Sequence, residues 1–389
     1  MEMSNLFDHP IIKARAKEVA ESKKRIESKG LDSETFCLMP FVNLILEPDG
    51  SVGLCRQKGT DFTLGYIQDQ SINEIWNGPF ARRWRREFLQ GKPHICETEL
   101  KHKGCQLCPS LNSMLSKAVL TETQAPTPLR LTANFNGRCN LQCQMCDVWK
   151  MPNGLYNDVN FWEPAKKDIF PFLHEIDMLS GEPFIQPDTY RLIDEVSAVN
   201  PDCLWSITTN MHWKLNDRIE KSMDKIKFKN LIMSIDSLNA QTYYKIRYPG
   251  KLDIVMENFK LIKDYEARRV QKGMTGFNIH INFLIQKDNW KEAREMIKFC
   301  LDHQAMPFLT FLYRPEEMSL LDLPENEREE ILDYYFHEYD WSELVLMRRV
   351  WSPLVDSLPR LSKASYLTQI QNIKSNHTLK YGEQDLELT

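Results

Sequence analysis

Three cysteines within eight residues are the part of this sequence best suited to chemistry. Cys139, Cys143 and Cys146 follow the spacing Cys-x-x-x-Cys-x-x-Cys. Thiolates are the ligands that iron–sulfur clusters prefer, and a cluster usually takes four of them. A loop that supplies three leaves one iron without a protein ligand, and an open metal position can bind a substrate or cofactor. Zinc is the alternative, although it normally takes four protein ligands, or His and carboxylate partners.

The size and charge of the chain exclude several classes of protein. It has 389 residues and a formal net charge of -5, so nothing indicates a nucleic-acid or anionic-membrane partner. Apolar runs such as Phe41–Leu46 are too short to cross a bilayer, and the first residues lack a signal-peptide pattern. We therefore expect a cytoplasmic protein whose 10 cysteines are metal ligands and buried thiols rather than disulfides.

The residues after a linker at about 121–128 alternate between strand-like and helical patterns. Six strand-like runs separated by helical patterns predict parallel strands with right-handed crossovers. Six units are too few for a closed eight-stranded barrel, so we predict an α/β fold with an open, partial (β/α)6 TIM-like barrel over residues 128–316. Active-site residues in such barrels lie at the carboxyl ends of the strands. The runs are Leu129–Phe135, Ile176–Leu179, Leu204–Thr209, Leu231–Ile235, Phe277–Leu284 and Phe308–Leu312.

Shorter segments flank the predicted barrel. Residues 1–35 contain one highly charged helix, which we expect on the surface. Residues 36–120 begin with a hairpin, because Asp49-Gly50 separates two apolar runs and is a strong turn signal. This hairpin, followed by a helix, brings Cys37 and Cys55 to the same end of a two-stranded ribbon. Residues 317–389 are predicted to be a helical extension, with a mobile polar tail from Asn372.

The cysteine loop resembles that of radical S-adenosylmethionine (radical SAM) enzymes, in which it follows the first barrel strand. Residues 36–110 resemble a SPASM or Twitch auxiliary-cluster domain, through Cys-x-x-Pro-aromatic, Asp-Gly-x-Val-x-x-Cys, Leu-Gly-x-Ile, Ile-Trp and Cys-x-x-Cys. Two features depart from that family: the domain precedes the barrel, and five cysteines suffice for one auxiliary cluster, which favours Twitch. The resemblance implies that four residues bind the auxiliary [4Fe–4S] cluster and that Cys96 is spare; a structural zinc site on the same four is the alternative. These four are Cys37, Cys55, Cys105 and Cys108.

The same resemblance implies which residues bind S-adenosylmethionine. Ser180-Gly181-Glu182-Pro183 is similar to the Gly-Gly-Glu-Pro motif that holds the cofactor's amino group, with Ser180 in place of a glycine. An ordinary turn is the alternative for this tetrapeptide.

Further cofactor contacts are expected at the ends of the next two strands and in the cysteine loop. Asn210 and Ser234 correspond to residues that contact the ribose and methionine portions, although Asn210 and Asp236 are also plausible helix caps. Arg247 resembles the arginine that pairs with the cofactor carboxylate. Met145 stands where relatives carry an aromatic ring, and we expect it to line the adenine.

The resemblance implies an enzyme with two [4Fe–4S] clusters and S-adenosylmethionine as cofactors. Reductive cleavage of that cofactor would yield a 5'-deoxyadenosyl radical that abstracts hydrogen from a substrate, with an electron donor such as flavodoxin or ferredoxin. A peptide or protein side chain is the leading substrate class, and a small molecule such as a sugar or aminocyclitol is the second. A non-catalytic metal-binding scaffold is the alternative of another class. The residues that act as catalytic acid or base are not identified by the sequence.

Overall fold

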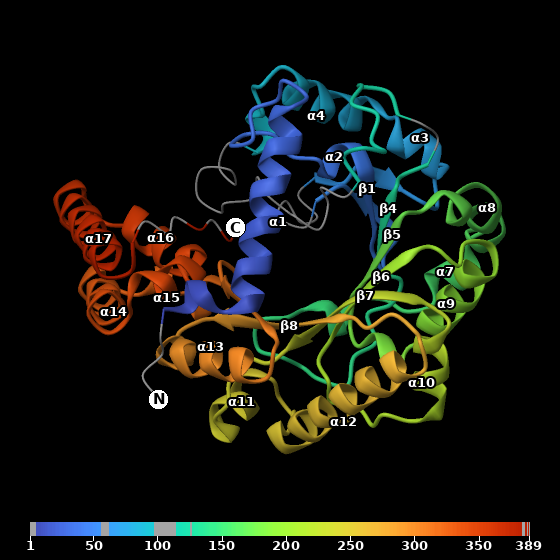
Figure 1. Cartoon of the computed structure of the whole chain (residues 1–389). Helices are drawn as coiled ribbons and strands as arrows, with labels where there is room; N and C mark the ends of the chain where they lie inside the picture. Colours follow the sequence, from blue (N-terminus) through green and yellow to red (C-terminus); the bar gives the residue numbers. More distant parts are fainter. Residues whose placement is uncertain are drawn as a thin grey trace.

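One curved, nine-stranded sheet organises the molecule, with its strands in the order β3-β2-β1-β4-β5-β6-β7-β8-β9. The computed structural model describes residues 5–55, 62–96, 114–124, 127–382, 386 and 388. Six consecutive strands run parallel, and Figure 1 shows helices covering the outer face of the curved sheet. The predicted partial barrel is confirmed. The six strands are β4 (Arg130–Ala133), β5 (Glu175–Met178), β6 (Leu204–Thr209), β7 (Lys227–Ser234), β8 (Asn278–Ile285) and β9 (Met306–Phe311).

The predicted hairpin is present, and it belongs to the same sheet as the barrel. Strands β1 (Asn43–Leu46) and β2 (Ser51–Gly53) pair antiparallel, and β3 (Gly65–Tyr66) adds to β2. Gly50 has a φ of 83° in the connecting turn, a conformation that glycine adopts readily. β1 also pairs parallel with β4 along its whole length, from Asn43 opposite Arg130 to Leu46 opposite Ala133. The amino-terminal segment therefore extends the barrel sheet.

Helices connect the strands and cover their outer face. The amphipathic helices α9 (Pro187–Val199) and α13 (Ala293–Asp302) bury apolar residues such as Leu192 and Ile297, as their spacing predicts. The helices of the barrel are α7 (Leu155–Asp158), α8 (Trp162–Asp168), α9 (Pro187–Val199), α10 (Asp217–Asp224), α11 (Ala240–Ile246), α12 (Leu252–Gln271) and α13 (Ala293–Asp302). Those of the amino-terminal segment are α2 (Met39–Val42), α3 (Ile72–Trp76) and α4 (Pro79–Leu89).

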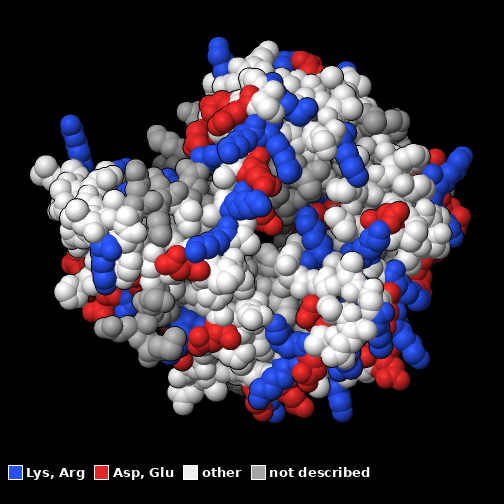
Figure 2. All heavy atoms as spheres, in the orientation of Figure 1, with Lys and Arg blue, Asp and Glu red and all other residues white. Residues whose placement is uncertain are grey.

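The first long helix, α1 (Pro10–Glu27), is more deeply packed than its charge suggested. Ile12, Val19 and Ile26 along one face are at most 2% exposed, so the prediction of a purely surface helix is corrected. The other face is charged. Figure 2 shows basic and acidic side chains intermingled over this side of the molecule, without a large field of one sign.

The carboxyl-terminal helices pack on the β9 side of the sheet. They are α14 (Glu325–Glu338), α15 (Trp341–Leu346), α16 (Arg348–Asp356) and α17 (Arg360–Tyr381), and Figure 1 shows them grouped on one flank. The mobile tail predicted from Asn372 is corrected as far as Tyr381, because α17 continues to that residue. One residue of this polar sequence packs in the interior: His377 is buried against the Phe7 ring, with 5.4 Å between the ring centroids.

A buried polar network joins the hairpin to the barrel. The Arg130 guanidinium lies 3.0 Å from Glu175 and 2.7 Å from Asp177, and it donates to Asn43 of β1 at 2.8 Å. Lys229 of β7 reaches the second oxygen of Glu175 at 2.6 Å. Four strands are therefore linked by side chains as well as by backbone pairing.

No helix within the described ranges is both long and apolar enough to cross a membrane.

Candidate functional site

The three-cysteine loop follows β4 at the carboxyl end of the parallel strands. Its backbone is tied to the segment after α11, because the amides of Gln142 and Gln144 donate to the carbonyls of Tyr248 and Ile246 at 2.6 and 3.0 Å. The Gln144 side chain also donates to Asp288, beyond the end of β8, at 3.0 Å. The loop is thus held by residues that lie more than 100 positions further along the chain.

The Ser180–Glu182 turn supports the residues that immediately precede Cys139. The Glu182 amide donates to the Arg138 carbonyl at 3.0 Å, and the Gln186 side chain donates to the carbonyls of Arg138 and Ser180, both at 2.8 Å. Gly181 has a φ of 51°, and a Cβ there would lie 2.1 Å from the Arg138 carbonyl oxygen. This close approach requires glycine, so the motif positions the cysteine loop whatever else it binds.

The carboxylate of Glu182 is committed to the protein. It is fully buried and accepts hydrogen bonds from the Phe184 amide at 3.1 Å, the Thr209 hydroxyl at 2.9 Å and the Asn210 amide at 2.8 Å. Burial raises the pKa of this carboxyl to about 7, although the hydrogen bonds act in the opposite direction. The side chain therefore ties the ends of β5 and β6 together, and its predicted contact with an amino group stays a prediction.

Asn210 lies beside the first cysteine. Its side-chain amide donates to the Cys139 sulfur at 3.6 Å and to Asn140 at 2.9 Å, while its oxygen accepts from the His212 amide. The helix caps are other residues, Asn216 for α10 and Asn239 for α11, so Asn210 and Asp236 do not take the capping roles that the sequence left open.

Two further predicted contacts lie on neighbouring elements of the same rim. Ser234 is 8% exposed at the end of β7, opposite Asn282 of β8. Met145 is partly exposed in the cysteine loop. Their predicted contacts with the cofactor stay predictions.

The fold places Arg247 beside the second cysteine, Cys143, where it pairs with the carboxylate of Asp236. Its Nε and Nη2 both lie 2.7 Å from Oδ2 of Asp236, and Nη1 lies 3.8 Å from the Cys143 sulfur. Burial alone would lower the pKa of Arg247, but the facing Asp236 carboxylate raises it. The guanidinium is thus a fixed positive charge next to a predicted metal ligand.

The surroundings of the sulfurs fit the predicted cluster. Burial raises the pKa of Cys139 to about 12 and also raises that of Cys143, so the thiolates need a compensating positive charge, which a metal supplies on binding. The Leu141 amide donates to the Cys139 sulfur at 3.4 Å, in addition to Asn210. Among the described residues no three His, Cys, Asp or Glu side chains converge to hold one ion. In a cluster each thiolate can bind a different iron, so the three sulfurs need not converge.

The predicted auxiliary ligands are described in part. Cys37 precedes α2 and Cys55 follows β2, where the Asn43 side chain donates to the Leu54 carbonyl at 3.0 Å. The sulfur of Cys96, predicted to be spare, accepts a hydrogen bond from the Trp84 indole at 3.3 Å. Cys105 and Cys108 lie outside the described residues.

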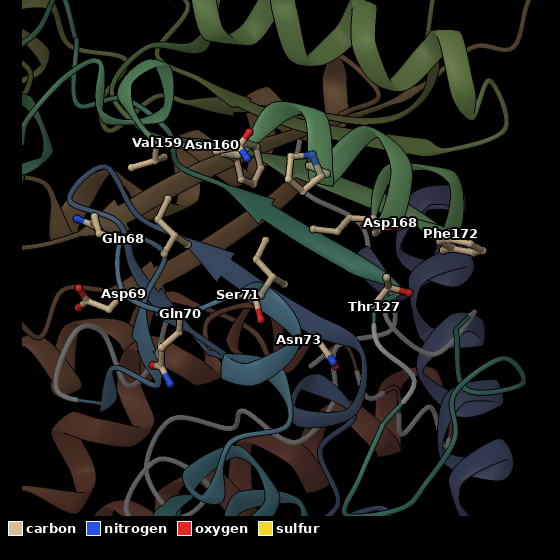
Figure 3. A pocket seen from close by; sticks show the side chains of 16 residues that line it. Gln68, Asp69, Gln70, Ser71, Asn73, Thr127, Val159, Asn160, Asp168 and Phe172 are labelled. Atoms are coloured by element: carbon tan, nitrogen blue, oxygen red, sulfur yellow. The ribbon is translucent and has the colours of Figure 1, made fainter.

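A cavity of about 790 Å³ lies away from the cysteine loop, between the β3–α3 connection and α8 (Figure 3). Ile72, Phe161 and Ile169 contribute apolar surface to it, and Asp69 and Asp168 contribute carboxylates. None of its 16 lining residues belongs to the predicted cofactor site.

Two family models match the chain in the places that the sequence indicated. One, described as "Radical SAM superfamily", matches residues 133–300, and the other, described as "Iron-sulfur cluster-binding domain" (SPASM), matches residues 37–109. Residues 133–300 are a radical SAM domain. The iron–sulfur cluster-binding domain precedes the radical SAM domain, as predicted. The two domains imply [4Fe–4S] clusters and S-adenosylmethionine as the cofactors of this chain.

The chain is similar to curated proteins named GTP 3',8-cyclase. It is 27% identical to that of Aliarcobacter butzleri over 44% of this chain and 51% of the relative, and 24% identical to that of Peptoclostridium acidaminophilum over 49% and 57%. The chain thus spans about half the length of these relatives. Among solved structures it is similar to Streptococcus suis SuiB, with a TM-score of 0.39 and 14% identity over 80% of this chain and 73% of SuiB.

Sequence reasoning missed the residues that hold this site together. Gln186 belongs to none of the motifs that carried the resemblance, and Asp236 was expected only as a helix cap at the end of a strand. Each acts on partners from another strand–helix unit. Gln186 lies three residues after Pro183, where the loop after a strand leads into a helix. This position was the feature of the sequence that could have identified it.

Proposed function

We propose that this chain is an enzyme in which Cys139, Cys143 and Cys146 hold a [4Fe–4S] cluster that binds S-adenosylmethionine. When bound, the two cofactors supply a 5'-deoxyadenosyl radical that abstracts a hydrogen atom from the substrate. The convergence of the ends of β5 and β6 on the cysteine loop, through Glu182 and Asn210, is the observation that carries the proposal. Cofactor contacts of Ser180, Gly181, Ser234, Arg247 and Met145 belong to the same proposal.

The residues of the chain orient and shield this chemistry. Gly181 and Gln186 fix the backbone before Cys139, and the carbonyls of Ile246 and Tyr248 fix the backbone on either side of the second cysteine. The site lies at the carboxyl ends of the strands, where barrels of this kind present substrates. A flavodoxin or ferredoxin is the proposed electron donor.

We further propose that Cys37, Cys55, Cys105 and Cys108 hold an auxiliary [4Fe–4S] cluster that takes an electron from the substrate radical or passes one to the first cluster. The match to the iron–sulfur domain supports this assignment, because it begins at Cys37 and ends one residue after Cys108. The proposed substrate is a peptide or protein side chain, since auxiliary domains of the resembled type accompany such substrates.

A small-molecule substrate is the second candidate, and the curated relatives favour it. Their name states that they cyclise GTP, and several of them match this chain. Deuterium transfer separates the candidates: a labelled peptide or a labelled nucleotide or sugar is incubated anaerobically with the enzyme, and 5'-deoxyadenosine is examined by mass spectrometry. Deuterium should enter 5'-deoxyadenosine from the true substrate alone.

The test of the enzyme itself precedes the choice of substrate. Anaerobically reconstituted protein with dithionite and S-adenosylmethionine should form 5'-deoxyadenosine and methionine, and a Cys143→Ala variant should form neither. Failure of the unaltered protein to form 5'-deoxyadenosine would support a non-catalytic metal-binding scaffold.

A further inference from the structure

A buried charge pair lies directly against one of the proposed cluster ligands. Arg247 is 7% exposed and Asp236 is 0% exposed. Arg247 donates through Nε and Nη2 to one oxygen of Asp236, both at 2.7 Å, and its remaining nitrogen, Nη1, lies 3.8 Å from the Cys143 sulfur. The guanidinium therefore spans a carboxylate on one side and a thiolate on the other.

Both members of the pair are fixed by the fold. The other oxygen of Asp236 accepts from the Leu284 amide at 2.8 Å, and the Asp236 carbonyl accepts from the Asn289 side chain at 2.9 Å. On the other side, the carbonyls that flank Arg247, at Ile246 and Tyr248, receive the amides of the cysteine loop. The same short segment thus sets the position of the guanidinium and of the loop that carries Cys143.

The charge of this donor distinguishes it from the other described contacts to the cysteine sulfurs. Cys139 accepts from the Leu141 amide and the Asn210 side chain, which are neutral groups. Hydrogen bonds to the sulfurs and nearby charges are among the main determinants of the reduction potential of a cluster. One-electron reduction adds one negative charge next to Cys143, which a buried cation stabilises and a buried anion opposes.

We propose that Arg247 and Asp236 together set the reduction potential of the cluster on Cys139, Cys143 and Cys146. Arg247 raises that potential through its contact with Cys143, and Asp236 holds Arg247 in place and partly offsets its charge. The inference rests on the proposed assignment of these cysteines as ligands. It gives Arg247 a role besides the predicted pairing with the carboxylate of S-adenosylmethionine, a role that operates before that cofactor binds.

Opposite signs for the two single variants test the proposal. The potential is measured by following the electron paramagnetic resonance signal of the reduced cluster, identified as the signal that changes when S-adenosylmethionine is added. At a fixed applied potential, Arg247→Gln should decrease the reduced-to-oxidised ratio by about tenfold, a shift of about 59 mV to more negative potential for one electron. Asp236→Asn should shift the potential in the positive direction, and the double variant should return toward the original value.

Arg269 provides the matched control. It is a buried arginine, 2% exposed, that lies 3.4 Å from Asp224 in the barrel, and it contacts none of the three cysteines. Arg269→Gln should lower stability and leave the potential unchanged. Arg247→Lys, which keeps the charge, should stay near the original potential and serves as the informative variant should Arg247→Gln not retain iron.

Two results would overturn the inference: single variants of Arg247 and Asp236 with unchanged potentials, or shifts of the same sign for both. These results differ from failure of the proposed function. A chain that takes up no iron through the three cysteines, or whose loaded form yields no 5'-deoxyadenosine, contradicts the proposed function instead.

Discussion

Glu182 accepts hydrogen bonds from one hydroxyl and two backbone amides inside the protein. In Glu182→Gln, an NH₂ group replaces one of the two acceptor oxygens, and this group cannot accept a hydrogen bond from those donors. An unsatisfied buried donor costs about 1–3 kcal/mol. The backbone amide of Asn210 donates a hydrogen bond to this carboxylate, and the Asn210 side chain donates one to Cys139. We therefore expect Glu182→Gln to lower the melting temperature and to weaken S-adenosylmethionine binding by about tenfold.

Thermal unfolding and equilibrium dialysis with the reconstituted protein measure the two effects of Glu182→Gln. The control is Glu195→Gln, which removes one partner of the Lys166–Glu195 ion pair at 2.7 Å on the outside of the barrel. That pair should contribute less than about 1 kcal/mol. Equal behaviour of the two variants would contradict the role assigned to Glu182.

His280 of β8 makes stability depend on pH. Burial, and then the positive charges of Arg15 and Lys229, lower its pKa to about 4. The unfolded chain, with an ordinary histidine pKa near 6.5, binds more protons than the folded protein between pH 6.5 and 4, so stability is lost as pH falls through this window. The loss contributed by His280 is about 1.5 kcal/mol between pH 6.5 and 5.

Urea unfolding of the apoprotein at several pH values measures this loss. His280→Gln should flatten the dependence between pH 6.5 and 5, whereas His303→Gln, at an exposed position, should leave it as it was. An unchanged slope in His280→Gln would mean that other groups carry the acid sensitivity.

At the scale of elements, the contact between the turn after β5 and the end of β4 depends on the absence of a side chain. In Gly181→Ala the new Cβ would meet the Arg138 carbonyl, a backbone atom that cannot move without shifting Cys139. We expect this variant to lose most of the iron of the first cluster and to unfold at lower temperature.

Gly273→Ala separates that contact from backbone strain. Gly273 also has a positive φ, 78°, but nothing lies within 4 Å of its added Cβ, so alanine there should cost about 1 kcal/mol and leave the iron content intact. Iron analysis of the two alanine variants side by side decides the point. Retention of full iron by Gly181→Ala would show that the turn can move away from the loop.

The junction between β1, β4 and β5 depends on Arg130. Replacement by methionine leaves Asp177 and Asn43 without this partner in a buried region, and breaking a buried charge pair typically costs about 3–5 kcal/mol. Denaturant unfolding should show a loss of this size for Arg130→Met. Lys227→Met, which removes the partner of the exposed Asp202, should lose less than about 1 kcal/mol, and a similar loss for both would mean that backbone pairing alone holds the hairpin.

The parallel strands were predictable from sequence because their apolar runs are bounded by turn residues and separated by helical patterns. β7 begins four residues before the predicted run, at Lys227. Lys227 and Lys229 interrupt the apolar pattern, although Lys227 still pairs with Leu204 and the register shifts at Lys229. The pairing of β1 with β4 was not predictable, since it joins segments more than 80 residues apart and leaves no local pattern. The three-cysteine site was predictable for the opposite reason, because its three proposed ligands are close together in the chain.

At the scale of the whole molecule, Cys55 and Cys139 lie beyond opposite ends of neighbouring strands of one sheet. Cys55 follows β2 beside Asn43, the first residue of β1, whereas Cys139 follows Ala133, the last residue of the parallel strand β4. The four residues of strand between these ends span about 13 Å.

This separation predicts that the two clusters can be removed independently. Cys105→Ala/Cys108→Ala should lose about four irons, the content of one cubane, and still cleave S-adenosylmethionine, because the loop at Cys139 is supported by β5, β6 and the segment after α11. Replacing Cys139, Cys143 and Cys146 should remove the other four and abolish cleavage. Anaerobic iron, sulfide and zinc analysis of both variants measures these outcomes. Loss of both clusters in Cys105→Ala/Cys108→Ala would refute the auxiliary ligand assignment. Zinc instead of a second iron–sulfur cluster in the unaltered protein would refute it as well. Either result would leave the assignment of the site at the carboxyl ends of the strands intact.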